Sequence, residues 1–129
     1  MPPDARDESG SAVVEFALLL PVLLLLLLAV VQIGVLASDR LLLTQAARAG
    51  AREAAIQEFD EAVREAATSA GAGLDPARLR LEVSRAGSRG SPVTVSLSYD
   101  VPVVGVLAGW LLPATVTIST AATARQEFG

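Results

Sequence analysis

Glu15 is the side chain in this sequence that most clearly invites a chemical role, because it is a carboxylic acid at the head of an apolar segment. From Phe16 to Ser38 the sequence contains no charged residue. At ~1.5 Å of rise per residue, a helix of that length spans the ~30 Å hydrocarbon core of a bilayer. A carboxylate near mid-bilayer costs something like 2.5–3.5 kcal/mol, and less near the interface, where Glu15 falls. We therefore expect Glu15 to have a specific partner.

The composition limits the other chemistry that this chain could do. Its 129 residues include no Cys and no His, which removes disulfides, thiolate nucleophiles, Cys-based zinc sites and the commonest general base. Ser, Asp, Glu and Arg are present, but no spacing among them suggests a catalytic group. We expect no enzyme activity, no metal and no cofactor. The net charge of −4 and the lack of a basic stripe also argue against a nucleic-acid partner.

Two interpretations of the apolar segment need no special role for Glu15. A secretory signal could be cut after Val35-Leu36-Ala37, but its apolar core should be only about 7–15 residues long. Glu15 and Pro21 would also lie inside that core, and the preceding residues are not basic. The other interpretation is a simple single-pass anchor in which Glu15 lies at the interface. This second interpretation explains the length of the segment and nothing else.

The third interpretation rests on a sequence motif. Gly10-Ser-Ala-Val-Val-Glu-Phe16 resembles the cleavage motif of type IV prepilins, in which Gly precedes the cut and Glu stands five residues after it. The Glu15-Phe16 pair is more like the Flp, or tight adherence, branch. With Pro21 following, Gly10 to Pro21 is similar to the TadE-like minor pseudopilins. Ala46-Ala-Arg-Ala-Gly-Ala-Arg52, and a last strand finishing in Ala124-Arg-Gln-Glu127, also resemble that family.

This resemblance implies a non-enzymatic role in assembly of a tight adherence type IV pilus. A prepilin peptidase would cut between Gly10 and Ser11, and Ser11 would become a free amino terminus and the candidate site for methylation. Glu15 and Phe16 would set the register of packing with other pilins and pseudopilins, Glu15 by meeting the Ser11 amine of its own chain or of a neighbour. The alternative is a single-pass envelope protein whose small domain binds an unidentified partner.

The resemblance also implies three regions and an orientation. These are a prepilin-type leader at 1–10, a transmembrane helix at 11–38 and an extracytoplasmic α+β domain at 39–129. Prepilins hold the leader in the cytoplasm and the domain outside the membrane. The positive-inside rule favours the opposite orientation, because Arg6 precedes the span while Arg40, Arg48 and Arg52 follow it. We follow the motif, because it is the more specific signal.

Beyond the span the sequence predicts an α+β domain. The first helix should continue to about Gln57, with small residues on two adjacent faces: Ala46, Gly50 and Ala54, then Ala47, Ala51 and Ala55. These faces suit packing onto the chain's own domain, onto a neighbouring subunit, or both. A second helix is expected from about Phe59 to Ala70. Alternating apolar residues then predict three antiparallel strands, near 79–84, 93–101 and 115–119, in a pilin-like arrangement.

The connection from Pro102 to Pro113 is unusual because it is uncharged and almost wholly apolar. It holds the only Trp of the chain, Trp110, and is too short to span a bilayer as a helix. It could fold back over the end of the sheet, or it could place Trp110 and Leu111 against lipid or a partner. The sequence leaves both possibilities open.

Overall fold

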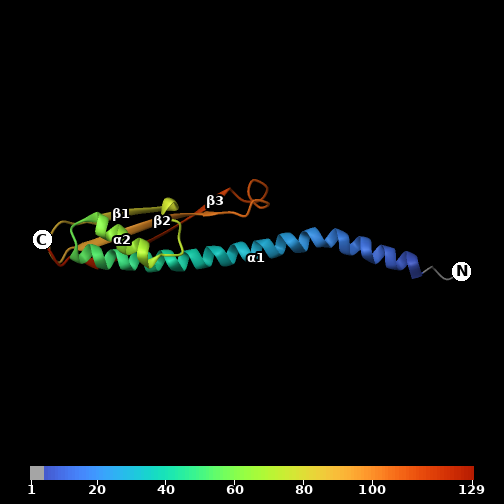
Figure 1. Cartoon of the computed structure of the whole chain (residues 1–129), viewed down its shortest axis with the longest axis horizontal. Coiled ribbons are helices and arrows are strands. Elements are labelled where there is room, and N and C mark those ends of the chain that lie inside the picture. The colour runs from blue at the N-terminus through green and yellow to red at the C-terminus, as the bar shows by residue number, and fades with distance from the viewer. Residues whose placement is uncertain (1–4) are drawn as a thin grey trace.

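One long helix carries a small sheet and a second helix (Figure 1). The computed structural model describes the backbone of residues 5–129 and the side chains from Glu8 onward; residues 1–4 of the predicted leader lie outside the described residues. Helix α1 runs from Ala5 to Ile56 and α2 from Asp60 to Ala70. A 3-10 turn, η1, at Pro76–Arg78 leads into strands β1 (Leu79–Arg85), β2 (Pro92–Pro102) and β3 (Thr115–Arg125). The predicted α+β fold is confirmed.

The sheet is antiparallel, with β2 between β1 and β3. The central strand alternates between a buried and a half-exposed side, as its sequence predicted. One side of β2 is fully apolar and packs toward α1, while the other presents hydroxyl groups and one acid. The inward residues are Val93, Val95, Leu97, Tyr99 and Val101.

Helix α1 packs against α2 on one side and against β2 and β3 on the other. Both small-residue faces of α1 are buried in this contact, so their packing onto the chain's own domain is confirmed. A Cβ added at Gly50 would lie 3.2 Å from Val95 and 3.4 Å from Ala67. Glycine therefore allows a close approach where α1 meets β2 and α2, and any side chain here would have to displace its neighbours slightly. Arg48 and Arg52 lie on the exposed side of the helix, as expected.

Two connections fix the ends of the domain. The Asp75 side chain accepts a hydrogen bond from the Ala77 amide, and the Asp75 amide donates to the Tyr99 hydroxyl at 3.2 Å. This ties the α2–β1 linker to the sheet. At the other end, the Glu127 amide donates to the Ala55 carbonyl at 2.8 Å. The segment after β3 is thereby joined to the end of α1.

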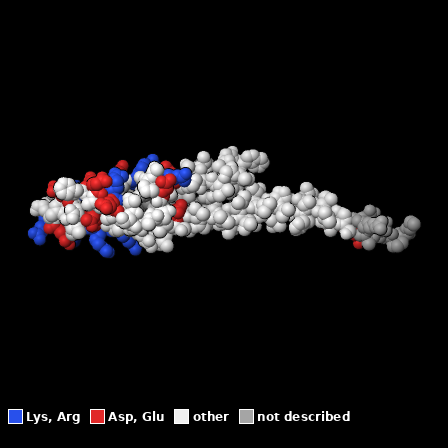
Figure 2. All heavy atoms as spheres, in the orientation of Figure 1, with Lys and Arg blue, Asp and Glu red and all other residues white. Residues whose placement is uncertain are grey.

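The charged residues gather over the part of the molecule that holds α2 and the sheet, and a long section of α1 is free of charge (Figure 2). Helix α1 bends in its N-terminal half (Figure 1), and Pro21 lies within that half of the helix. A proline inside a helix removes one backbone hydrogen bond and causes such bends. Within the described residues, α1 is the helix long and apolar enough to cross a membrane.

Candidate functional site

The predicted processing motif lies on the exposed N-terminal part of α1. Gly10, Ser11, Glu15 and Phe16 are all exposed, and the helix begins at Ala5, so the Gly10–Ser11 peptide bond is inside it. Ser11 and Glu15 are four residues apart and thus lie on the same face, one turn from each other. Among residues 8–129, no side chain donates a hydrogen bond or forms an ion pair with the Glu15 carboxylate. Within those residues, a partner for the Glu15 carboxylate would have to be a group that the uncut chain does not have.

Most of the exposed large apolar side chains of α1 lie between Val13 and Val35, and beyond them only Leu41 and Ile56 of the described part of the helix are exposed. In water this surface would be strongly unfavourable, at ~25 cal/mol for each Å². The first charged residues after Glu15 are Asp39 and Arg40. The Asp39 side chain is half-buried, and this desolvation raises the pKa of its carboxyl. The apolar surface of α1 therefore ends where the charged part of the domain begins.

Gln32 is a structural residue whose contacts the sequence alone did not predict. Its side chain is only 3% exposed although it lies in the middle of the apolar segment. Its Nε2 donates to the Pro102 carbonyl at 3.2 Å, and its Oε1 accepts from the Val104 amide at 3.0 Å. A single carboxamide thus satisfies the backbone on both sides of Val103. The signal was available, since Gln32 and Ser38 are the polar residues in an otherwise apolar run.

These two hydrogen bonds hold the β2–β3 connection against α1. Val103 and Leu107 are buried, while Trp110 and Leu111 are 87% and 67% exposed. The sequence allowed this connection either to fold back over the sheet or to face lipid or a partner. The structure shows both, because some of its residues face inward and others face outward. A groove of about 720 Å³ separates the outward residues from α1. It is lined by Val106, Trp110 and Leu111 from the loop and by Pro21, Leu24, Leu25 and Leu28 from the helix.

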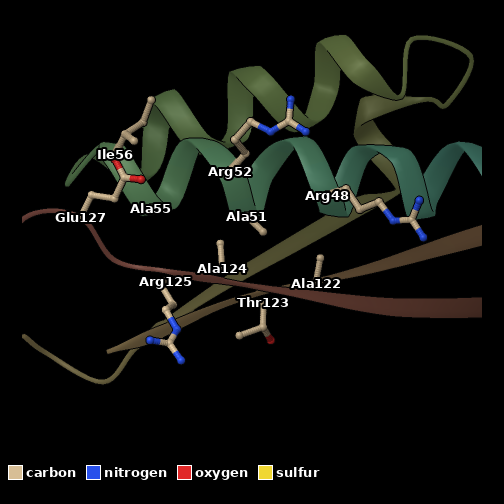
Figure 3. A pocket seen from close by; sticks show the side chains of 10 residues that line it. All are labelled: Arg48, Ala51, Arg52, Ala55, Ile56, Ala122, Thr123, Ala124, Arg125 and Glu127. Carbon is tan, nitrogen blue, oxygen red and sulfur yellow. The ribbon is translucent and has the colours of Figure 1, made fainter. Parts of the chain in front are cut away.

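A second groove lies between the end of α1 and β3 (Figure 3). Its floor is formed by alanines, and Arg48, Arg52 and Arg125 stand around it. The three guanidinium groups point in different directions and do not converge on the groove (Figure 3). This arrangement lacks the convergent donors that an anion site needs. Among the residues whose side chains are described, no group of three acids could hold a metal ion.

Comparison with known proteins agrees with the motif. No curated protein and no solved structure matches this chain. The family model of TadE-like proteins matches residues 10–52, which begin at the predicted cleavage motif and end within the domain-packed part of α1. This family suggests involvement in Tad pilus assembly through a membrane-anchoring helix. Residues 10–52 of this chain are therefore similar to the TadE-like family, as the Gly10–Pro21 motif predicted.

Proposed function

We propose that this protein is a minor pseudopilin of a tight adherence type IV pilus assembly system. In this role a prepilin peptidase removes residues 1–10, and the remaining apolar helix packs beside the helices of other pilins. The observation that carries the proposal is the TadE-like match over residues 10–52, with Glu15 on an exposed apolar helix face. The protein acts as a substrate and subunit, not as an enzyme.

Cleavage after Gly10 would supply a partner for Glu15, which has none among the side chains of residues 8–129. The new α-amino group of Ser11 is cationic, and it lies one helical turn from the Glu15 carboxylate. Two opposite charges that approach each other in a membrane stabilise each other, because each is otherwise desolvated without compensation. The same amine of a neighbouring subunit could meet Glu15 when helices pack side by side. The acid thus favours one register of assembly. Methylation of the Ser11 amine would keep its positive charge.

The exposed part of α1 is available for this packing. The small-residue faces of the C-terminal half are already covered by α2 and the sheet. Contacts with other pilins must then come from the N-terminal half, where most of the side chains from Val13 to Val35 are exposed. The proposed orientation keeps the leader in the cytoplasm, where the peptidase acts, and the domain outside. A reporter fused after Gly129 tests this orientation.

The amino-terminal sequence of the mature protein tests the proposal. The protein should be isolated from membranes of cells that hold the whole pilus system, with a peptidase-deficient strain as the control. A mature terminus at Ser11 that depends on the peptidase is the expected result. A terminus at Ser38 would indicate a secreted domain, and an uncut chain would indicate an envelope anchor with a partner-binding domain. Either of these outcomes contradicts the pseudopilin role.

A further inference from the structure

The β2–β3 connection exposes its largest apolar side chains although it belongs to the folded domain. Trp110 is 87% exposed, more than any other large hydrophobic residue in the described part of the chain. Val106 and Leu111 lie beside it and are also mostly exposed. No charged residue occurs between Asp100 and Arg125. This surface would be costly in water, and its composition suits a hydrocarbon environment.

The position of the loop along α1 decides which environment it meets. Its groove is lined by helix residues from Pro21 to Leu28, inside the uncharged segment. Leu28 and Pro21 precede Asp39 by about 16 and 27 Å along the helix axis, at ~1.5 Å per residue. The uncharged segment is about 34 Å long and the hydrocarbon core is ~30 Å thick, so the helix can shift by only ~4 Å. If α1 spans the membrane, the loop reaches the middle of the core and extends beyond it.

Many backbone amides of the loop have a hydrogen-bond acceptor within the protein. Polar backbone groups in hydrocarbon must be satisfied within the protein. Within the loop the amides of Leu107, Ala108, Gly109, Leu111 and Leu112 all donate to loop carbonyls. The Val103 amide donates to Ala114, and the Val104 amide donates to Gln32.

Proline removes the need for two more donors. The segment begins and ends with Pro102 and Pro113, which have no amide hydrogen. Seven of the ten amides between the two prolines thus donate within the protein, while no acceptor within the described residues takes the amides of Gly105, Val106 and Trp110. Gln32 pairs with the Pro102 carbonyl and the Val104 amide, although it is itself a polar side chain in the apolar segment. Its carboxamide is paired on both its donor and its acceptor side.

We propose that residues 103–112 form a membrane-inserted hairpin, and that lipid acyl chains fill the groove between this hairpin and α1. The occupant is lipid because both walls of the groove are uncharged and continuous with the exposed apolar surface of the spanning helix. The domain then contacts the bilayer at two points, α1 and the hairpin, which fixes its orientation on the membrane. This inference requires that α1 spans the bilayer, but it is independent of cleavage after Gly10.

Trp110 is the only Trp in the chain and therefore reports on its own surroundings. The full-length protein should be reconstituted into phosphatidylcholine vesicles whose acyl chains carry bromine, either near the headgroup or near mid-bilayer. Emission from Trp110 should fall roughly twofold with the deep label, and less with the shallow one, because the loop reaches the core. Aqueous acrylamide should quench it weakly.

Two reference variants in a Trp110→Phe background complete the experiment. Leu26→Trp places the probe on an exposed position of the spanning segment, and Ile56→Trp places it at the exposed far end of α1. The hairpin proposal holds if Trp110 behaves as the Leu26→Trp probe does. It is overturned if Trp110 behaves as the Ile56→Trp probe does, which would place the loop in water. Protection from both quenchers would show a second copy on the loop and also overturn it.

The same experiment separates this inference from the proposed function. If the Leu26→Trp probe itself is not quenched by bromine, α1 does not span the bilayer and the hairpin inference fails with it. If the Leu26→Trp probe is quenched and Trp110 is not, only the hairpin inference fails. In that case a mature terminus at Ser11 would still support the pseudopilin role.

Discussion

The side chain of Gln32 accepts a hydrogen bond at 3.0 Å from the amide of Val104, which lies 72 residues further along the chain. This contact, with the one from Gln32 to Pro102, joins the apolar helix to the far end of the sheet. It places the most apolar loop of the domain beside the most apolar segment of α1. The domain and the anchor are therefore one structure rather than two parts joined by a helix.

Gln32→Leu should release the loop from α1. Leucine keeps most of the volume but leaves the Pro102 carbonyl and the Val104 amide without partners, at ~1–3 kcal/mol for each buried group. Because each ~1.4 kcal/mol changes an equilibrium tenfold, amide exchange in residues 102–113 should quicken by about tenfold or more. Hydrogen exchange with mass spectrometry in detergent micelles measures this. Ser38→Ala is the matched control, since Ser38 is exposed. Unchanged exchange in Gln32→Leu would show that the Gln32 hydrogen bonds do not hold the loop against α1.

Trp110 and Leu111 should be dispensable for folding, in contrast to the buried Leu107. The double variant Trp110→Ser, Leu111→Ser removes side chains that face outward, so the unfolding temperature of the domain in detergent should change little. Leu107→Ser buries a hydroxyl in an apolar site and should cost ~2–4 kcal/mol. Thermal unfolding followed by circular dichroism compares the two. Unfolding of the double variant would mean that these residues cap the sheet. The same double variant should weaken membrane or pilin association.

Glu15→Ala should impair assembly with partner pilins without affecting the domain. The alanine removes the carboxylate that would meet the Ser11 amine, and a loss of ~1.4 kcal/mol in this contact lowers incorporation about tenfold. Co-purification with the partner pilins measures incorporation. Glu8→Ala is the control, because Glu8 is also exposed on α1 but lies in the leader that cleavage would remove. Equal incorporation of both variants would show that Glu15 sets no register.

Gly10→Ala should slow cleavage by the peptidase. The Gly10–Ser11 bond lies within α1, and a protease needs the chain unwound at the bond that it cuts. Alanine stabilises a helix relative to glycine by up to ~1 kcal/mol and so opposes unwinding. A Cβ at Gly10 would meet no atom within 4 Å, and the same is true of Gly34, which makes Gly34→Ala the matched control. Mass spectrometry of the products over time compares the two, and equal rates would remove Gly10 from the recognition site.

Gly50→Val should destabilise the domain. The added side chain would overlap Val95 and Ala67, which the structure places within 3.4 Å of a Cβ at this position. Overpacking of this kind costs ~1–3 kcal/mol. The measurement is the free energy of unfolding in detergent, with Gly34→Val as the control for β-branching in a helix. A cost equal to that of the control would show that α1 can move away from the sheet.

Local patterns in the sequence predicted most of the fold. The alternation of Val93, Val95, Leu97, Tyr99 and Val101 required a strand with one buried side, and the structure has that strand. The helix was expected to end near Gln57, and it ends at Ile56. These features depend on neighbours along the chain, so the sequence contains enough information to find them.

The contact between the loop and α1 could not be predicted in this way. It depends on residues about 70 positions apart, and no periodicity connects Gln32 with Val104. The sequence suggested that the loop would either fold back or face outward, and it placed Trp110 and Leu111 as a possible interface. Only the structure shows that Leu107 turns inward while Trp110 turns outward along the helix. The partner of Glu15 stays a prediction, because it requires a cut chain or a neighbouring subunit.

The attachment of the β2–β3 pair to α1 at both of its ends also has a mechanical consequence. Strands β2 and β3 each have 11 residues and are ~37 Å long, and they are joined to α1 through Gln32 at one end and through Ala55 at the other. A pull on the far end of the domain is then shared between the helix and the hairpin. Because the two attachments lie at opposite ends of the strands, force between them runs along the strands rather than across them. The domain would then resist stretching and transmit tension to the membrane.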